Sequence, residues 1–231
     1  MNRILFETDE VKGSVATIGD IRAEHILTVL RGEVGQELKV GVVDGKIGTG
    51  RITGIAGREV TVELELNGES LKPWFDLILA PPRPRVFKRL LPQLAALGMR
   101  KLTLIGARKV EKDFWGATIL KEENYRPLFV EGLQQAGTSI LPTIEIERSF
   151  RRFLAGCEAM DGLKLVAHPY GADGRAERRP DEWLTLAVGP EGGWTEDEVK
   201  AFEEKGFKRY SPGARILRSD TAIVALAAKF M

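Results

Sequence analysis

An apolar run, a glycine-rich loop and a capped helix, in that order, constrain the fold of this chain most strongly. Residues 184–188 are the apolar run, and the string GPEGGW occupies residues 189–194. Thr195 and Glu198 then match a capping box, in which each side chain accepts a hydrogen bond from the other residue's backbone N–H. This order is typical of an α/β protein, and it predicts free backbone N–H groups at the carboxyl edge of a sheet, where such proteins bind ligands.

The glycine-rich loop fits either a cofactor loop or an ordinary connection between a strand and a helix. It is no Walker loop, because Gly-Lys-Ser/Thr does not follow, and it lacks the GxGxxG spacing of dinucleotide-binding proteins. Gly192 and Gly193 would let the backbone approach a ligand closely. Three acids, at residues 196–198, would repel a phosphate. A ligand with a positive centre therefore fits better than a phosphate.

The periodicity of the chain changes near Pro73, which indicates two domains. Residues 37–43, 46–55 and 59–66 read as strands joined by hairpin turns, after a short helix at residues 22–30, and closely spaced hairpins suggest a small barrel. Beyond Pro73, apolar strands alternate with helices, which predicts an α/β layer with a mostly parallel sheet. The predicted strands are 77–80, 102–105, 163–167 and 184–188, and the predicted helices are 86–97, 125–136, 196–206 and 221–230. We place the domains at residues 1–70 and 73–231.

Few residues in the chain suit a metal centre or a disulfide framework. Cys157 is the single cysteine, and His25 and His168 are the two histidines. We expect Cys157 in the core, a structural role for His25, and no metal. No apolar stretch is long enough to cross a bilayer, and the first residues lack the architecture of a signal peptide, so we expect a cytoplasmic protein without a membrane partner.

The positive charge of the chain is concentrated in its middle. The formal net charge is only +1, but residues 83–112 hold nine cations against one anion, Glu111. Such a stretch is either a nucleic-acid contact or an ordinary solvated surface. Its cations are Arg83, Arg85, Lys88, Arg89, Arg100, Lys101, Arg108, Lys109 and Lys112.

A second motif, GARILRSDTA at residues 213–222, precedes the last predicted helix. Ser219 is a good N-cap for that helix, and Arg215 and Arg218 add fixed cations. Ile216 and Leu217 would form either an apolar wall for a flat ring or part of the core. Without the first motif, the segment reads equally well as a capped terminal helix with two solvated arginines.

The strings GPEGGW and GARILRSDTA together resemble the signature of the RsmE family within the SPOUT superfamily of methyltransferases. HILTVLR, at residues 25–31, resembles the family's His-x-x-x-VLR segment, and Arg108 matches the arginine of its Ser-x-Arg. Two departures fall in the second motif, where Pro212 replaces leucine and Asp220 replaces glutamate. Four more departures fall where the family has Lys, Glu, Glu and Arg. The residues at these positions here are, in the same order, Gln93, Ala96, Gln134 and Thr138. These four lie on the presumed RNA side, so they put the target base, rather than the cofactor, in doubt.

The resemblance implies a PUA-like RNA-binding barrel over residues 1–70 and a trefoil-knotted methyltransferase domain over residues 73–231. It further implies S-adenosylmethionine (AdoMet) as methyl donor, a homodimer, and methylation of N3 of a uridine in 16S ribosomal RNA. The implied cofactor residues are Ala167, His168, Val188, Gly189, Pro190, Glu191, Gly192, Gly193, Pro212, Gly213, Ile216 and Leu217. We expect the RNA to contact Arg83, Arg85, Lys88, Arg89, Arg108 and Lys109.

Methylation at N3 requires loss of a proton and stabilisation of the negative charge that develops on the base. We assign stabilisation of this negative charge to Arg218, and removal of the N3 proton to Asp220 or Glu191. Asp220 could instead only cap the last helix, and Glu191 could only bond backbone amides or balance the positive sulfur. Two other functions stay open: methylation of another RNA position, such as ribose 2′-O, and a non-catalytic RNA-binding role in ribosome assembly.

Overall fold

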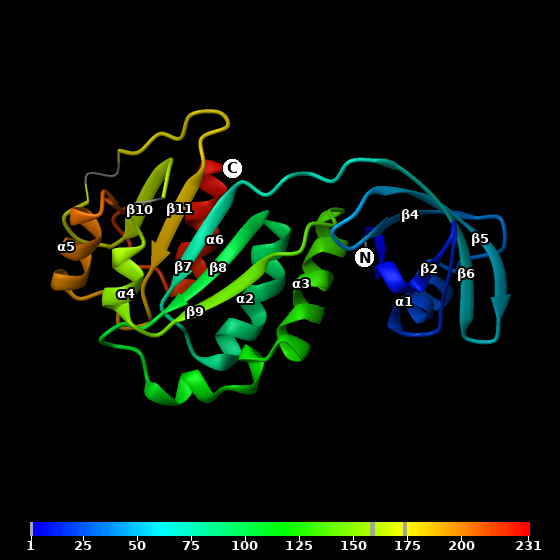
Figure 1. The fold of residues 1–231 in the computed structure, drawn as a ribbon, viewed down its shortest axis with the longest axis horizontal. Helices are drawn as coiled ribbons and strands as arrows, with labels where there is room; N and C mark the ends of the chain where they lie inside the picture. The colour runs from blue at the N-terminus through cyan, green and yellow to red at the C-terminus, as the bar shows by residue number, and fades with distance from the viewer. Residues whose placement is uncertain (1, 158–159, 173–174) are drawn as a thin grey trace. The chain divides into compact units, whose positions relative to one another are not determined.

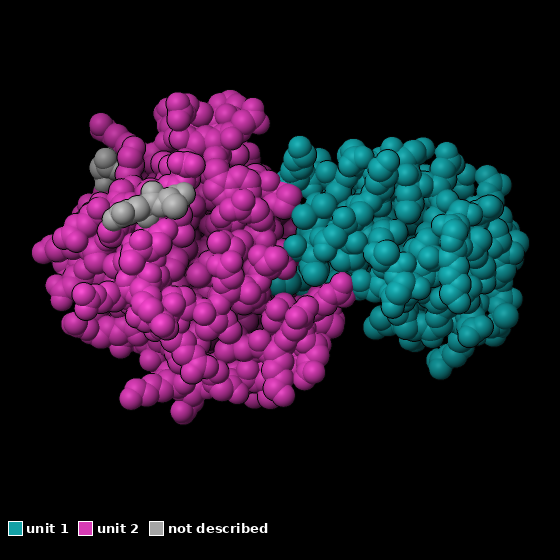
Figure 2. Space-filling view, in the orientation of Figure 1, with its two compact units in different colours: residues 1–72, 129–141 teal, residues 73–128, 142–231 magenta. Residues whose placement is uncertain are grey.

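The computed structural model describes residues 2–157, 160–172 and 175–231 (Figure 1). It divides into two compact units, residues 1–72 with 129–141 and residues 73–128 with 142–231 (Figure 2). The first boundary lies beside the one we place at residues 70–73. Residues 129–141, which we place in the second domain, group with the first unit instead. The reason is a set of backbone hydrogen bonds, since Gln134 O accepts from the N–H groups of Asn2 and Arg3 at 3.0 and 3.1 Å.

Unit 1 is built on one six-stranded sheet with the order β1-β4-β5-β6-β3-β2. All neighbours are antiparallel except β1 and β4, and the β4–β5 and β5–β6 pairs are the predicted hairpins. A short helix with a π-helical turn covers one side, and Ile26 from that turn joins the buried residues of the strands. The elements are β1 Ile4–Phe6, β2 Val11–Lys12, β3 Val15–Ile18, α1 Ile21–Glu24, the π turn His25–Val29, β4 Glu37–Val42, β5 Ile47–Ala56 and β6 Glu59–Gly68.

Unit 2 contains a second six-stranded sheet, with the order β12-β10-β11-β7-β8-β9. Every pairing in it is parallel, as the alternation of strands and helices predicts. Its strands are β7 Phe75–Leu79, β8 Met99–Ile105, β9 Thr143–Glu147, β10 Leu163–Ala167, β11 Leu184–Val188 and β12 Lys208–Tyr210. Its helices are α2 Pro84–Ala96, α4 Phe150–Ala155, α5 Glu196–Glu204, α6 Ser219–Phe230 and the first part of α3 Glu122–Ala136.

Helices cover both faces of the unit 2 sheet (Figure 1). On one face, α4 and α5 contribute Phe153 and Phe202 to a buried cluster with Ile78 of β7. Successive strand residues point to opposite faces, so Leu77 and Leu79 of β7 face the other side, where α2 packs on α6. Because both faces are covered, these strands are apolar runs rather than alternating patterns.

Three details of the helices differ from the sequence predictions. The proline at position 92, within the predicted helix 86–97, suggests a kink or a break there, but α2 runs as one helix through Pro92, and Leu90, Leu91 and Leu94 on both sides of it are buried. Helix α3 begins at Glu122, so Pro127 lies inside it and not in its first turn. In α6, the N-cap position falls on Arg218 rather than Ser219, which is the first helical residue and is buried.

Candidate active site

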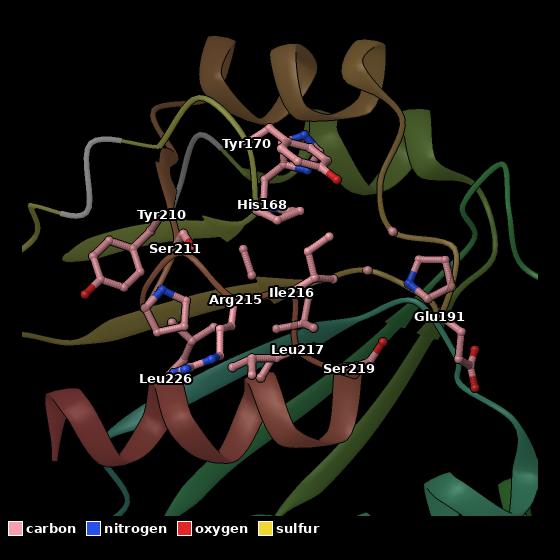
Figure 3. A pocket seen from close by; sticks show the side chains of 18 of the residues that line it. His168, Tyr170, Glu191, Tyr210, Ser211, Arg215, Ile216, Leu217, Ser219 and Leu226 are labelled. Atoms are coloured by element: carbon pink, nitrogen blue, oxygen red, sulfur yellow. The ribbon is translucent and has the colours of Figure 1, made fainter.

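A cavity of about 240 Å³ lies at the carboxyl ends of β10, β11 and β12. Three segments far apart in the sequence form it, together with one side of α6: the end of β10, the glycine-rich loop after β11, and the segment between β12 and α6 (Figure 3). Of the residues predicted to bind a cofactor, only Gly213 does not line it. The lining residues are Ala167, His168, Pro169, Tyr170, Val188, Gly189, Pro190, Glu191, Gly192, Gly193, Tyr210, Ser211, Pro212, Arg215, Ile216, Leu217, Ser219, Ala222 and Leu226.

The glycine-rich loop turns sharply, and two of its glycines are required by geometry. A Cβ atom on Gly189 would lie 2.9 Å from the backbone N of Trp194, closer than side chains approach. Gly193 has a φ of 66°, which is costly for other residues, and its N–H donates to Pro190 O at 2.8 Å. The loop therefore folds back on itself, and its backbone lines the cavity.

Glu198 joins two elements beside this loop. Its Oε2 accepts from the Thr195 N–H and hydroxyl at 2.8 and 2.9 Å, and the Thr195 hydroxyl accepts from the Glu198 N–H, which completes the predicted capping box. Its Oε1 accepts from the backbone N–H of Arg108 at 2.7 Å. The side chain is only 7% exposed. One buried carboxylate thus ties the start of α5 to the loop that follows β8.

Glu191 is exposed, and its carboxylate accepts a hydrogen bond from the backbone N–H of Arg83 at 2.9 Å. Figure 3 shows this carboxylate pointing away from the other labelled side chains of the cavity. Arg83 follows β7, which is the neighbour of β11 in the sheet. The contact therefore ties the glycine-rich loop to the next loop along the edge, and it matches the interpretation in which Glu191 bonds a backbone amide.

His168 stands directly after β10, with its side chain 11% exposed and its Nε2 3.7 Å from the Glu196 carboxylate. Within the described part of the chain, its buried Nδ1 has no hydrogen-bond partner. Burial, and then the charge of Arg209, lower the pKa of His168 below its usual 6.5, so the imidazole is neutral at neutral pH. Arg209 also bonds Glu196 at 2.6 Å and Glu203 at 3.1 Å, and holds this side of the cavity against α5.

Two of the three predicted catalytic residues do not line the cavity. Arg218 is exposed, and its Nε lies 3.8 Å from Asp220 Oδ1. Asp220 instead lines a neighbouring groove between α2 and α6, where its Oδ2 lies 3.4 Å from Arg89 Nη2. Its Oδ1 accepts from the Thr221 N–H at 3.0 Å, within the first turn of α6. Both residues stand next to Ser219, which does line the cavity.

The six predicted RNA-binding residues are all exposed. Arg83, Arg108 and Lys109 stand in the loops after β7 and β8, and the other three, Arg85, Lys88 and Arg89, lie in the first two turns of α2. Two of them also contact the cofactor side, since Lys109 Nζ donates to Gly192 O at 2.8 Å and Arg108 lies 3.8 Å from Asp197. Gln134, named above among the presumed RNA-side departures, is instead buried in unit 1.

Sequence reasoning missed eight lining residues: Pro169, Tyr170, Tyr210, Ser211, Arg215, Ser219, Ala222 and Leu226. Pro169 and Tyr170 directly follow a predicted strand end, so extending the site by two residues would have found them. Tyr210 and Ser211 belong to the end of β12, which has only three residues and gives no strand signal.

Across the described residues, no helix is long and apolar enough to span a bilayer, and no group of three or more His, Cys, Asp or Glu side chains is arranged to hold a metal ion.

Three comparisons place this chain among known proteins. A family model described as "RNA methyltransferase domain" matches residues 69–231. The chain is 32% identical to "Ribosomal RNA small subunit methyltransferase E" of Treponema pallidum, over 99% of this chain and 90% of the relative. It is 26% identical to "Ribosomal RNA small subunit methyltransferase E 1" of Borreliella burgdorferi, over 97% and 95%. A crystal structure of the ribosomal RNA small subunit methyltransferase E from Neisseria gonorrhoeae, bound to S-adenosyl methionine, matches this chain with a TM-score of 0.77 at 24% identity. The match covers 99% of this chain and 96% of that one, and it establishes the shared fold.

Proposed function

This chain belongs to the family of RNA methyltransferase domains that includes the small-subunit ribosomal RNA methyltransferases E, and from that membership we propose that it transfers a methyl group from AdoMet to N3 of a uridine in small-subunit ribosomal RNA. Its relatives from Treponema pallidum and Borreliella burgdorferi are named ribosomal RNA small subunit methyltransferase E, and their similarity extends over nearly the whole chain. The resemblance of both motifs to the RsmE family supplies the position on the base.

The observation that carries the proposal is the meeting of the two motifs in one cavity. Its backbone loop and the apolar side chains of Ile216, Leu217 and Leu226 suit a ligand with a flat ring and polar groups, as AdoMet is. Ala167, residues 188–193, Pro212, Ile216 and Leu217 would hold it, together with His168. When bound, AdoMet supplies a methyl group on a positively charged sulfur. The three acids at the start of α5 do not line the cavity, so they do not act directly on that charge.

RNA would reach this cavity along the carboxyl edge of the sheet. Arg83, Arg85, Lys88 and Arg89 follow β7, and Arg108 and Lys109 follow β8. Phosphate contacts by such residues release counterions, so affinity should fall steeply with added salt. A salt-independent affinity for small-subunit ribosomal RNA, measured by fluorescence anisotropy, would argue against this surface.

We assign the stabilisation of negative charge on uracil to Arg218, and removal of the N3 proton to Asp220 or Glu191. AdoMet, held by the cavity residues named above, would supply the methyl group that N3 receives, and Asp220 or Glu191 would take the N3 proton. Arg218 is exposed, and its Nε lies 3.8 Å from Asp220 Oδ1, so its guanidinium is available to a substrate. Glu191 lines the cavity but bonds the Arg83 N–H, whereas Asp220 stands outside the cavity and pairs with Arg89, so the proposal keeps both carboxylates.

The same proposal includes the barrel, the knot and the homodimer that the resemblance implies. The PUA-like barrel would correspond to the sheet of residues 1–70, the trefoil knot to the crossing of the segments near residues 189–193 and 211–218, and the active enzyme would be a homodimer. The crowding of those two segments around one cavity supports the knot. Light scattering of the purified protein tests the dimer.

The deciding experiment is nucleoside mass spectrometry of unmodified small-subunit ribosomal RNA treated with the protein and AdoMet. We expect a methylated uridine whose methyl group stays with the base after the glycosidic bond is cleaved. A methyl group that stays with the sugar would establish ribose 2′-O transfer, and no methylation would contradict the enzymatic assignment. Arg218→Ala should lower turnover about 100-fold, a typical cost for losing one charge-stabilising group, with AdoMet affinity retained.

A further inference from the structure

Lys109 connects the loop after β8 with the glycine-rich loop after β11, although 83 positions separate it from Gly192. Its Nζ donates to Gly192 O at 2.8 Å. Its aliphatic stem lies across Gly192 as well, because a Cβ atom there would meet Lys109 Cδ at 2.9 Å and Cβ at 3.3 Å. Gly192 lines the cavity and Lys109 does not. The lysine therefore holds a wall of the cavity from outside it.

The backbone beneath Lys109 is itself anchored. The preceding N–H, of Arg108, donates to the buried Glu198 carboxylate at 2.7 Å, and the N–H of Val110 closes a turn onto Ala107 O at 3.1 Å. Glu198 in turn caps α5. Because its backbone is fixed in this way, the Lys109 ammonium is positioned over the glycine-rich loop.

The ammonium keeps capacity for a second ligand. A lysine ammonium has three N–H donors, and the contact with Gly192 uses one of them. The side chain is exposed, and among the described residues no carboxylate forms an ion pair with it, in contrast to Arg89 and Arg108. An oxygen of an RNA phosphate is the natural partner for such a cation at this edge.

We propose that Lys109 couples the two binding events of this enzyme, by holding the Gly192 carbonyl with one N–H and a backbone phosphate of the RNA with another. Lys109 is a positioning residue in this scheme, and the inference rests on the proposed function. A phosphate bound to the ammonium fixes the lysine over Gly192, which stabilises the loop in the form that lines the cavity. RNA therefore increases the affinity for the methyl donor, and by linkage the donor increases the affinity for RNA by the same factor.

The test is a thermodynamic cycle measured by calorimetry with S-adenosylhomocysteine, which occupies the donor site without transferring a methyl group. Its affinity is measured with and without a small-subunit ribosomal RNA transcript. For the native protein we expect the transcript to tighten binding roughly fivefold, the lower end of typical couplings. Lys109→Met should bind equally well with and without RNA, and Lys109→Arg, which keeps a donor and the charge, should retain most of the coupling.

Lys112→Met is the matched control, because it removes an exposed lysine from the same loop with no hydrogen bond to Gly192 among the described contacts. It should lower RNA affinity through the lost charge but leave the native coupling factor. Equal coupling in the native protein and in Lys109→Met would overturn the inference, as would no coupling in the native protein. Failure of the native protein to bind S-adenosylhomocysteine at all, or to methylate the RNA, would instead overturn the proposed function.

Discussion

Replacing Glu198 by alanine should destabilise unit 2 more than any other single change of an acidic residue in α5. The carboxylate accepts from the backbone N–H groups of Arg108 and Thr195 at 2.7 and 2.8 Å and from the Thr195 hydroxyl at 2.9 Å. A hydrogen bond to a charged group contributes about 1.5 kcal/mol or more, so losing the two backbone partners costs about 3 kcal/mol. The residue is 7% exposed, so water replaces these bonds poorly.

Urea unfolding followed by tryptophan fluorescence measures this effect in the right part of the chain. Trp74, Trp115, Trp183 and Trp194, the four tryptophans, all belong to unit 2. Glu198→Gln should lose less than Glu198→Ala, because an amide keeps one oxygen acceptor but must turn its NH₂ group toward a donor. Binding of S-adenosylhomocysteine should weaken in parallel, since the same carboxylate positions the loop after β8.

Glu204→Ala is the control, because Glu204 is an exposed residue near the end of the same helix, with a predicted change within about 0.5 kcal/mol. If Glu198→Ala unfolds at the urea concentration of the native protein, the buried carboxylate does not hold these elements together. Equal losses in the two variants would point to the charge of α5 rather than to the hydrogen bonds.

Three further predictions concern single residues. Gly189→Ala should lower affinity for S-adenosylhomocysteine at least about tenfold by calorimetry, because its Cβ would meet Trp194 N at 2.9 Å, whereas Gly116→Ala, with no atom within 4 Å, should bind normally. Burial lowers the pKa of His168 below 6.5, so the unfolded chain takes up that proton first as the pH falls. Stability should therefore drop as the pH falls below about 6.5 by more in the native protein than in His168→Asn, and equal drops in urea midpoints would contradict this. Burial raises the pKa of the Cys157 thiol to about 11, so a disulfide reagent at about pH 8 should label it only after unfolding, and rapid labelling of the folded protein would refute its burial.

The class of the unit 2 fold follows from short apolar runs, because strands buried on both faces need apolar residues at every position. Residues 77–79 and 186–188 are such runs, and all of their side chains are buried. The same reasoning does not predict the edge strands. Strand β12 has three residues, and in β9 Ile146 is 46% exposed, so neither presents a continuous apolar run.

The sequence motifs identified residues that line the cavity, but not the long-range contacts that hold those residues in place. The glycine-rich loop and the segment before α6 are recognisable strings, and their residues line the cavity. The contacts of Glu191 with Arg83 and of Lys109 with Gly192 span 108 and 83 positions. Such pairs form only where particular strands are neighbours in the sheet. The local periodicity of a sequence does not predict the order of the strands.

Strand order also explains why the glycine-rich loop is the junction of the site. Strand β11 lies between β10 and β7, so its loop has the cofactor-side segments on one side and the cationic loops after β7 and β8 on the other. Glu191 bonds the backbone of the first cationic loop and Gly192 accepts from a lysine of the second, while Gly189 to Gly193 line the cavity. Under the proposed function, a reaction between a donor in the cavity and a base delivered along the cations would occur beside this loop, and any change that shifts the loop should affect donor binding and RNA binding together.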